Sequence, residues 1–204
     1  LPLELTFATK GELAIGLLRD AFADGVCLDF VAGDEVYGAC TTLRTFLEEQ
    51  GQAYVLRIRA TFTLTLGGGT CLTCEQVVTK HLKQKRKWTI RSAGDGSKGE
   101  RTYAWAWIAT ASPTHFLLVR KHRTTGEMAF HYCFVPEDRP VTLPRLIAGA
   151  GLRWPVEVRH LQYWSSTDRL SRWVLPAGFG IGSSGGVEPA SALVVARRPG
   201  AELA

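Results

Sequence analysis

Two acidic residues, Asp34 and Glu157, have the sequence surroundings expected of carboxylates that do chemistry. Asp34 directly follows residues 26–33, a largely apolar run with β-branched and aromatic residues that predicts a buried strand. In open α/β sheets, functional side chains collect just past the carboxyl ends of strands. Arg153 precedes Glu157 by four positions, so the two share one face if this segment is helical. The two carboxylates therefore suggest metal-dependent chemistry on phosphodiesters, whereas a simple salt bridge with Arg153 is the alternative for Glu157.

Basic residues are concentrated in two segments further along the chain. Between Lys80 and Arg101 there are eight Lys or Arg residues and two acidic ones, within a net charge of +5. This density favours a phosphate-rich partner, because each neutralised phosphate releases condensed counterions, although a solvated basic face is the alternative. Residues that could position DNA without reading its sequence are Lys83, Lys85, Arg86 and Lys87 in the first segment, and Arg120, Lys121 and Arg123 in the second.

The elements that must position these residues alternate between helix and strand. Thr9 and Glu12 have capping-box spacing and precede a helical apolar pattern, which predicts a helix closed near Gly25. The strand that ends at Asp34 comes next, followed by a predicted helix over 42–50 and a strand over 54–59. This order is typical of the α/β class. Helical character returns at 142–148 and again around 153–160.

Changes in the hydrophobic pattern divide the chain into four expected parts. After residue 60, runs of period two separated by turn-rich stretches predict strands. From about residue 165 onward no periodicity is sustained, which predicts a loosely structured tail. The expected parts are a first portion of an α/β core at 1–59, a β-rich insertion at 60–136, a returning helical portion of the core at 137–164, and the tail at 165–204.

The composition favours a cytoplasmic protein without a membrane partner. A hydrophobic content of 46% and a charged content of 21% are ordinary for globular proteins. No apolar run is long enough to span a bilayer, and the start of the chain has no signal-peptide pattern. The five cysteines, an odd number, favour reduced thiols in a cytosol. Because the chain begins at Leu1, we expect a fragment.

Several short segments, in a linked order, resemble the transposases of bacterial insertion sequences with a DDE catalytic core. The most informative are Val31-Ala-Gly-Asp34-Glu-Val-Tyr-Gly38 and Arg153-Trp-x-x-Glu157. Further matches lie at 7–14, 92–99 and 103–107, and the resemblance covers roughly residues 3–158. It implies an RNase H-like core interrupted by a β-rich insertion before its last helix. It also implies a bacterial, nucleoid-associated protein that cleaves and transfers DNA strands.

The same resemblance implies a set of site residues. In this family three carboxylates hold two Mg²⁺ ions; Asp34 matches the second carboxylate and Glu157 the third. Arg153 matches an Arg of the signature helix that supports DNA engagement. Two cations about 4 Å apart can activate a water or a 3′-hydroxyl and stabilise the leaving oxygen. The implied partners are transposon ends and target DNA, with a homodimer in a synaptic complex.

The chain also departs from the family pattern. No segment matches the first Asp of the family, Ala150 stands where a Tyr is usual, and Trp164 stands where a Lys is usual. The similarity stops just past Glu157. These departures predict a truncated or frameshifted transposase that is inactive alone. The alternative function is a catalytically inactive, DNA-binding transposon remnant.

Overall fold

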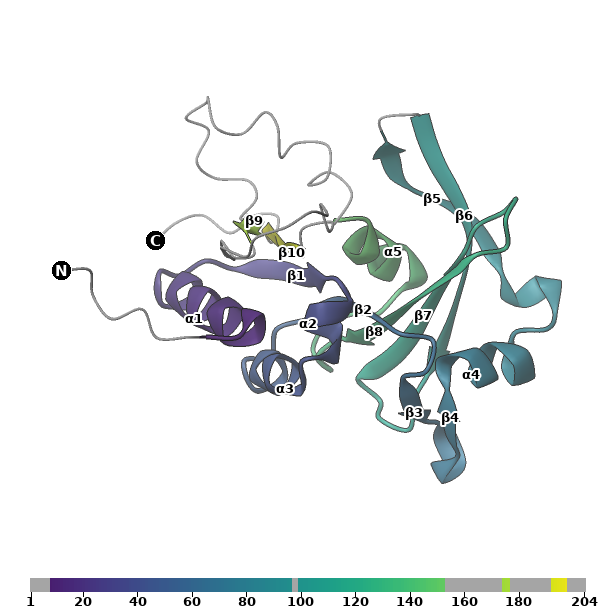
Figure 1. Cartoon of the computed structure of the whole chain (residues 1–204), viewed down its shortest axis with the longest axis horizontal. Helices are drawn as coiled ribbons and strands as arrows, with labels where there is room; N and C mark the ends of the chain where they lie inside the picture. Colours follow the sequence, from purple (N-terminus) through teal and green to yellow (C-terminus); the bar gives the residue numbers. More distant parts are fainter. Residues whose placement is uncertain (1–7, 97–98, 153–173, 177–191, 198–204) are drawn as a thin grey trace, which may run out of the picture.

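The chain forms a mixed α/β structure in which helices cover both faces of a curled sheet (Figure 1). The computed structural model describes residues 8–96, 99–152, 174–176 and 192–197. Within these residues the main sheet has the strand order β5-β6-β7-β8-β2-β1-β10-β9. The predicted α/β class is therefore confirmed at this level.

The first part of the chain follows the predicted order of elements. Helix α1 (Lys10–Ala23) begins at the capping box, where the Glu12 N–H donates to Thr9 Oγ1 (3.3 Å) and the Thr9 N–H donates to the Glu12 carboxylate (2.7 Å). Strand β1 (Leu28–Gly33), helix α3 (Thr41–Glu49) and strand β2 (Tyr54–Ile58) follow. Strands β1 and β2 are parallel, as expected for strands joined by helices on one face.

The other strands continue the same sheet in antiparallel steps from β2. Strand β8 (Met128–Phe134) pairs with β2, and β7 (His115–Lys121), β6 (Gly99–Ala109) and β5 (Thr89–Gly96) follow in turn. The segment expected as an insertion, 60–136, thus supplies strands to the sheet that contains β1. Beside β1 lie β10 (Ala192–Arg197) and then β9 (Val174–Pro176), two strands within the predicted tail. The division into four domains remains a prediction.

Apolar contacts divide the core into three clusters. The first lies between α1, α3 and the β1–β2 pair, and the second lies under α5 (Leu143–Gly151) on the opposite face. The third packs α4 (Cys74–His81) and the hairpin β3 (Thr63–Thr65)–β4 (Cys71–Thr73) against β7 and β8. None of the helices in the described part of the chain is long and apolar enough to cross a membrane.

Candidate functional site

Asp34 lies at the junction between β1 and a short helix, α2 (Glu35–Ala39), that it caps. Its Oδ1 accepts the Val36 N–H (2.9 Å) and its carbonyl oxygen accepts the Gly38 N–H (2.9 Å). The residue is 8% exposed, so its carboxylate is held rigidly at the end of the strand. An ionised carboxylate can accept hydrogen bonds on both oxygens, and the cap uses only one of them. Burial, and next the charge of Asp34, raise the pKa of the neighbouring Tyr37 hydroxyl, which stays protonated.

Helix α2 packs directly on the backbone of β2. A Cβ at Gly38 would lie 1.8 Å from the Arg57 carbonyl oxygen, so only glycine allows this approach. The Glu35 carboxylate pairs with Arg57 (3.2 Å) and Arg59 (3.7 Å) of the same region. Of the two adjacent carboxylates, Glu35 is therefore bound to guanidinium groups and Asp34 to backbone N–H.

Helix α5 begins beside the start of β1 and ends against β5. Near its start, Arg145 Nη2 donates to Asp29 Oδ1 (2.7 Å) at the beginning of β1. Near its end, Gly149 packs closely on Phe30 and on Val55, and Val55 pairs with Ala32 of β1. At the end of the helix, a Cβ on Gly151 would lie 2.7 Å from the Ala93 carbonyl oxygen, so the described chain leaves α5 beside β5 (Thr89–Gly96). The predicted residues Arg153 and Glu157 come next in sequence but lie outside the described residues.

The strand directions and register place one of the predicted basic segments beyond the level at which β1 ends. Strands β1, β2 and β7 point the same way, because β8 is antiparallel to both β2 and β7. The register places Gly33, the last residue of β1, level with Leu56, Tyr132 and Leu117. The basic residues Arg120, Lys121 and Arg123 therefore lie three to six residues beyond the level at which β1 ends. They are also three strands away across the sheet, which alone is roughly 14 Å at the usual strand spacing.

The two faces of β7 divide that basic segment. The Arg120 guanidinium lies 4.6 Å from the Tyr103 ring centroid, in the face that carries α5. Lys121 Nζ lies 5.7 Å from the Trp88 ring centroid, in the face that carries α4. Successive strand residues point to opposite faces, which explains the division.

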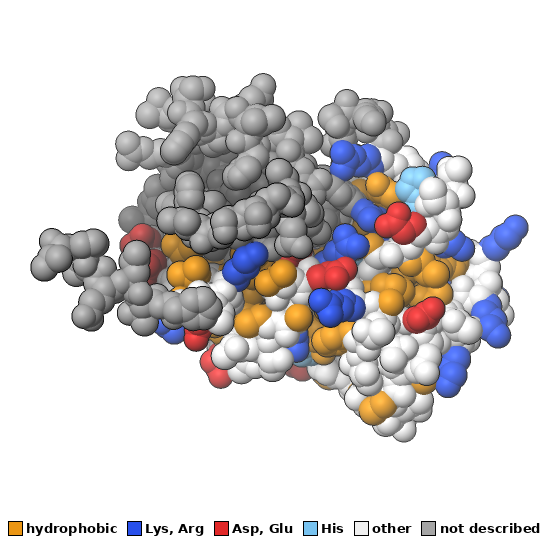
Figure 2. Space-filling model, viewed as in Figure 1, with side chains coloured by type: hydrophobic (Ala, Val, Ile, Leu, Met, Phe, Trp, Pro, Cys, Tyr) orange, Lys and Arg blue, Asp and Glu red, His pale blue; other side chains and the backbone are white. Residues whose placement is uncertain are grey.

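Trp88 connects Lys121 to the other predicted basic segment. The Trp88 indole N–H donates to the Leu82 carbonyl (2.8 Å), just after α4. Here the end of α4 and the 3-10 turn Lys85–Lys87 surround an open hollow of about 330 Å³. Figure 2 shows Lys and Arg side chains along the right-hand edge, the side on which α4 lies in Figure 1. The residues that line this basic hollow are Lys80, His81, Lys83, Gln84, Arg86 and Lys87. Lys85 is exposed in the same turn.

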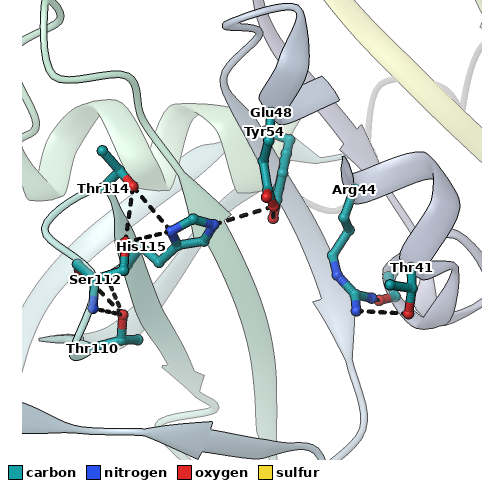
Figure 3. Close-up of polar contacts among 9 residues, drawn as sticks. Thr41, Arg44, Glu48, Tyr54, Thr110, Ser112, Thr114 and His115 are labelled. Carbon is teal, nitrogen blue, oxygen red and sulfur yellow. Dashed lines mark hydrogen bonds and ion pairs between the residues drawn. The ribbon is translucent and has the colours of Figure 1, made fainter. Parts of the chain in front are cut away.

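A polar cluster at the opposite edge of the sheet was not predicted (Figure 3). In the structure, His115 Nε2 lies 3.2 Å from Glu48 Oε1, which also accepts the Tyr54 hydroxyl (2.6 Å). Burial, followed by the Glu48 bond, raises the pKa of Tyr54 far above its usual value, so Tyr54 remains a donor. Glu48 and His115 are 67 residues apart, and no sequence pattern joins them.

The described residues supply only part of a metal site. They contain no group of three or more His, Cys, Asp or Glu side chains that could hold a metal ion. Asp34 is a chemically suitable oxygen ligand at a rigid strand end. The described part of the chain therefore offers one of the carboxylates that the sequence predicts.

Comparison of the chain with models of protein families finds no match, and neither characterised proteins nor solved structures show a significant similarity.

Proposed function

We propose that this chain is the catalytic domain, in a truncated or degenerate copy, of a DDE-type transposase that cleaves and transfers DNA strands with Mg²⁺. The observation that carries the proposal is the position of Asp34 at the edge of the sheet where β1 ends. Asp34 is fixed at this edge by its cap on α2, and α5, which precedes Arg153 and Glu157 in the sequence, packs against the same strand. A parallel β1–β2 pair with helices on both faces is compatible with an RNase H-like core, which we propose for 1–59 and 137–164.

Asp34 and Glu157 are the residues that we propose as Mg²⁺ ligands. Asp34 has an oxygen beyond its capping bond, and Glu157 comes six residues after the end of α5, a helix that packs against β1. When bound, Mg²⁺ would activate the attacking oxygen and stabilise the leaving oxygen of the phosphodiester. The protein residues would hold the ions at a fixed place, because strand ends and helices are rigid supports.

The basic hollow and the end of β7 support DNA as the partner. Lys83, Arg86 and Lys87 present exposed cations around the hollow, and Lys121 is linked to them through Trp88. Such cations contact phosphates without reading bases. Transposon ends and target DNA are the proposed ligands, and a homodimer in a synaptic complex is the proposed assembly, in a bacterial nucleoid. We propose that Arg153 engages DNA beside Glu157.

A catalytically inactive DNA-binding remnant is the second candidate. It is favoured by the position of the basic hollow, which is lined by the end of α4 and the residues that follow it, without any contribution from Asp34. DNA binding therefore does not require an intact carboxylate set.

Plasmid nicking and DNA binding together test the two candidates. The chain as it stands should bind duplex DNA with a steep salt dependence but should not nick a supercoiled plasmid in Mg²⁺. Adding back an upstream segment with the missing carboxylate, and a downstream helix, should produce nicking that Asp34→Asn and Glu157→Gln abolish. Glu35→Gln is the matched control and should leave nicking intact.

The remaining outcomes separate the candidates. Nicking by the unaltered chain would contradict its inactivity. Salt-dependent binding with no nicking after restoration would favour the remnant. Failure to bind DNA at all would reject both candidates.

A further inference from the structure

We propose that His115 and Glu48 are positioning residues for Asp34, which they influence through helix α3 and Arg44. They fix the end of α3 to the β6–β7 turn, and Arg44 on the preceding turn of α3 fixes the end of α2, the helix that Asp34 caps. The inference rests on the proposed function in one respect, because that function makes Asp34 a metal ligand whose position matters.

His115 is held by its ring faces and by both ring nitrogens. Its Nδ1 lies 2.9 Å from Ser112 Oγ and 3.0 Å from Thr114 Oγ1, and its Nε2 lies 3.2 Å from Glu48 Oε1 (Figure 3). An ionised carboxylate only accepts, so we assign the proton to Nε2, and a hydroxyl group then donates to Nδ1. The ring packs against Tyr132 (centroids 5.2 Å apart) and against Phe134 (5.1 Å), which leaves the imidazole one orientation.

Glu48 transmits this constraint to α3. Its Oε1 accepts from His115 of β7 and from the fully buried Tyr54 of β2. A single carboxylate oxygen thus joins the helix to two strands. Hydrogen bonds to a charged group are stronger than neutral ones, so the end of α3 is tightly fixed.

Arg44 carries the constraint from α3 to α2. Its Nη1 donates to the Gly38 carbonyl at the end of α2, and its Nη2 donates to Thr41 Oγ1 (3.2 Å). The guanidinium lies over Tyr132, 6.0 Å from the ring centroid, and Tyr132 is the ring on which His115 stacks. Because the Gly38 N–H in turn donates to the Asp34 carbonyl, the two ends of α2 are coupled through one turn of helix.

A nucleophilic role for Ser112 is the competing interpretation of this cluster. Ser112, His115 and Glu48 have the order of a hydrolase triad. However, the Ser112 N–H donates to Thr110 Oγ1, and the next residue, Pro113, has no N–H. The backbone donors that would stabilise an oxyanion beside Ser112 are therefore engaged or missing. The contacts favour positioning over catalysis.

Hydrogen exchange of the Val36 and Gly38 amides tests the proposal directly, because both amides donate to Asp34. His115→Phe keeps the packing between Tyr132 and Phe134 but removes the bonds of both nitrogens. It should raise the exchange rate of both amides about fivefold, which is the change expected from the loss of one hydrogen bond. The exchange rates of amides in the middle of β7 and β8 should change less. The matched control is His122→Phe, which removes bonds to Thr124 and Thr125 at the other end of β7 and should leave α2 unchanged.

Two further variants locate the coupling within the network. Arg44→Lys should raise exchange at Val36 and Gly38 by a similar factor, and combining it with His115→Phe should add little, because the two act on one path. Glu48→Gln is the milder variant that carries the test if His115→Phe does not fold. The proposal is overturned if these variants lower global stability with no preferential effect on α2, or if the effects of Arg44→Lys and His115→Phe simply add.

Exchange is measured without DNA or Mg²⁺, so its outcome is independent of the nicking experiment. Ser112 is tested in the same samples with a fluorophosphonate probe. Labelling of the unaltered chain that Ser112→Ala removes would overturn the positioning assignment in favour of a nucleophile.

Discussion

The two proposed sites, Asp34 at the end of β1 and the basic hollow beside α4, have opposite physical surroundings. Asp34 is 8% exposed and bonded to the backbone, whereas the Lys and Arg residues of the hollow are exposed. A metal ligand must be placed within fractions of an ångström, which requires a packed surrounding. Phosphate contacts act over longer distances and tolerate mobile side chains, so exposure suits them. The difference indicates that changes near Asp34 should alter stability, and changes at the hollow should alter binding alone.

The largest effect is expected for Gly38→Ala at the Asp34 end. The new Cβ would meet the Arg57 carbonyl at 1.8 Å, and backbone cannot yield as a side chain can. We expect a loss of about 3 kcal/mol in the free energy of unfolding, measured with urea. Gly16→Ala is the control, because a Cβ there meets nothing within 4 Å and a helix gains about 0.5–1 kcal/mol from alanine. Equal effects of the two substitutions would contradict the tight fit of α2.

At the hollow, the combined substitution of Lys83, Arg86 and Lys87 by Gln should weaken DNA binding without affecting folding. Each phosphate contact removed should reduce the slope of log K against log salt by about 0.9. Filter binding at several salt concentrations measures the slope, and thermal unfolding checks stability. Arg19→Gln, which removes one positive charge on α1 away from the hollow, is the control for a change of charge elsewhere. A large drop in melting temperature for the triple variant would contradict the expectation that changes at the hollow alter binding alone.

Tyr54→Phe tests how much the polar cluster contributes to stability. Loss of the hydroxyl that donates to Glu48 should cost about 1 kcal/mol near pH 7. Burial raises the pKa of Tyr54 in the folded chain above its unfolded value near 10. Its stabilisation is therefore complete below pH 10 and is lost as the pH rises further, because the unfolded tyrosine ionises first.

Between about pH 10 and 11.5, the free energy of unfolding should fall less steeply with pH for Tyr54→Phe than for the unaltered chain. Burial also raises the pKa of Tyr132 and of Tyr37, so some alkaline sensitivity should remain. Identical alkaline profiles for both chains would contradict the role of Tyr54.

The smallest effect is expected for Glu35→Gln, which sharpens the contrast between neighbouring carboxylates. Its partners Arg57 and Arg59 have side chains 33% and 78% exposed, and exposed ion pairs contribute little. We expect a loss of about 0.5 kcal/mol or less in urea unfolding. A loss above that of Tyr54→Phe would show that Glu35, rather than Gly38, holds α2 in place.

Local signals in the sequence explain which elements could be predicted. The Thr9–Glu12 capping box and the apolar run before Asp34 act over a few residues, and both elements occur as predicted. Helix α2 has five residues, too few for a periodic pattern, and its place depends on the contact between Gly38 and Arg57. Helix α4 has a capping box at Thr73 and Gln76 that could have revealed it.

Pairing between distant segments explains what could not be predicted. The β-like runs of 60–136 were recognised as strands, but their pairing partners are not encoded in alternation. Strand β8 joins β2, and β10 joins β1, through backbone hydrogen bonds that any sequence of suitable shape can make. The sequence therefore could not tell a separate insertion from a continuous sheet.

The sequence by itself determined the residue types available for chemistry, the place of Asp34 after a buried strand, and the density of charge between Lys80 and Arg101. Only the tertiary structure decided that α2 packs on β2 through Gly38, and that His115 meets Glu48. The physical reason is the separation along the chain over which each interaction acts. Capping and periodicity act between neighbours in the chain, whereas strand order and side-chain clusters depend on which surfaces pack together once the chain has folded.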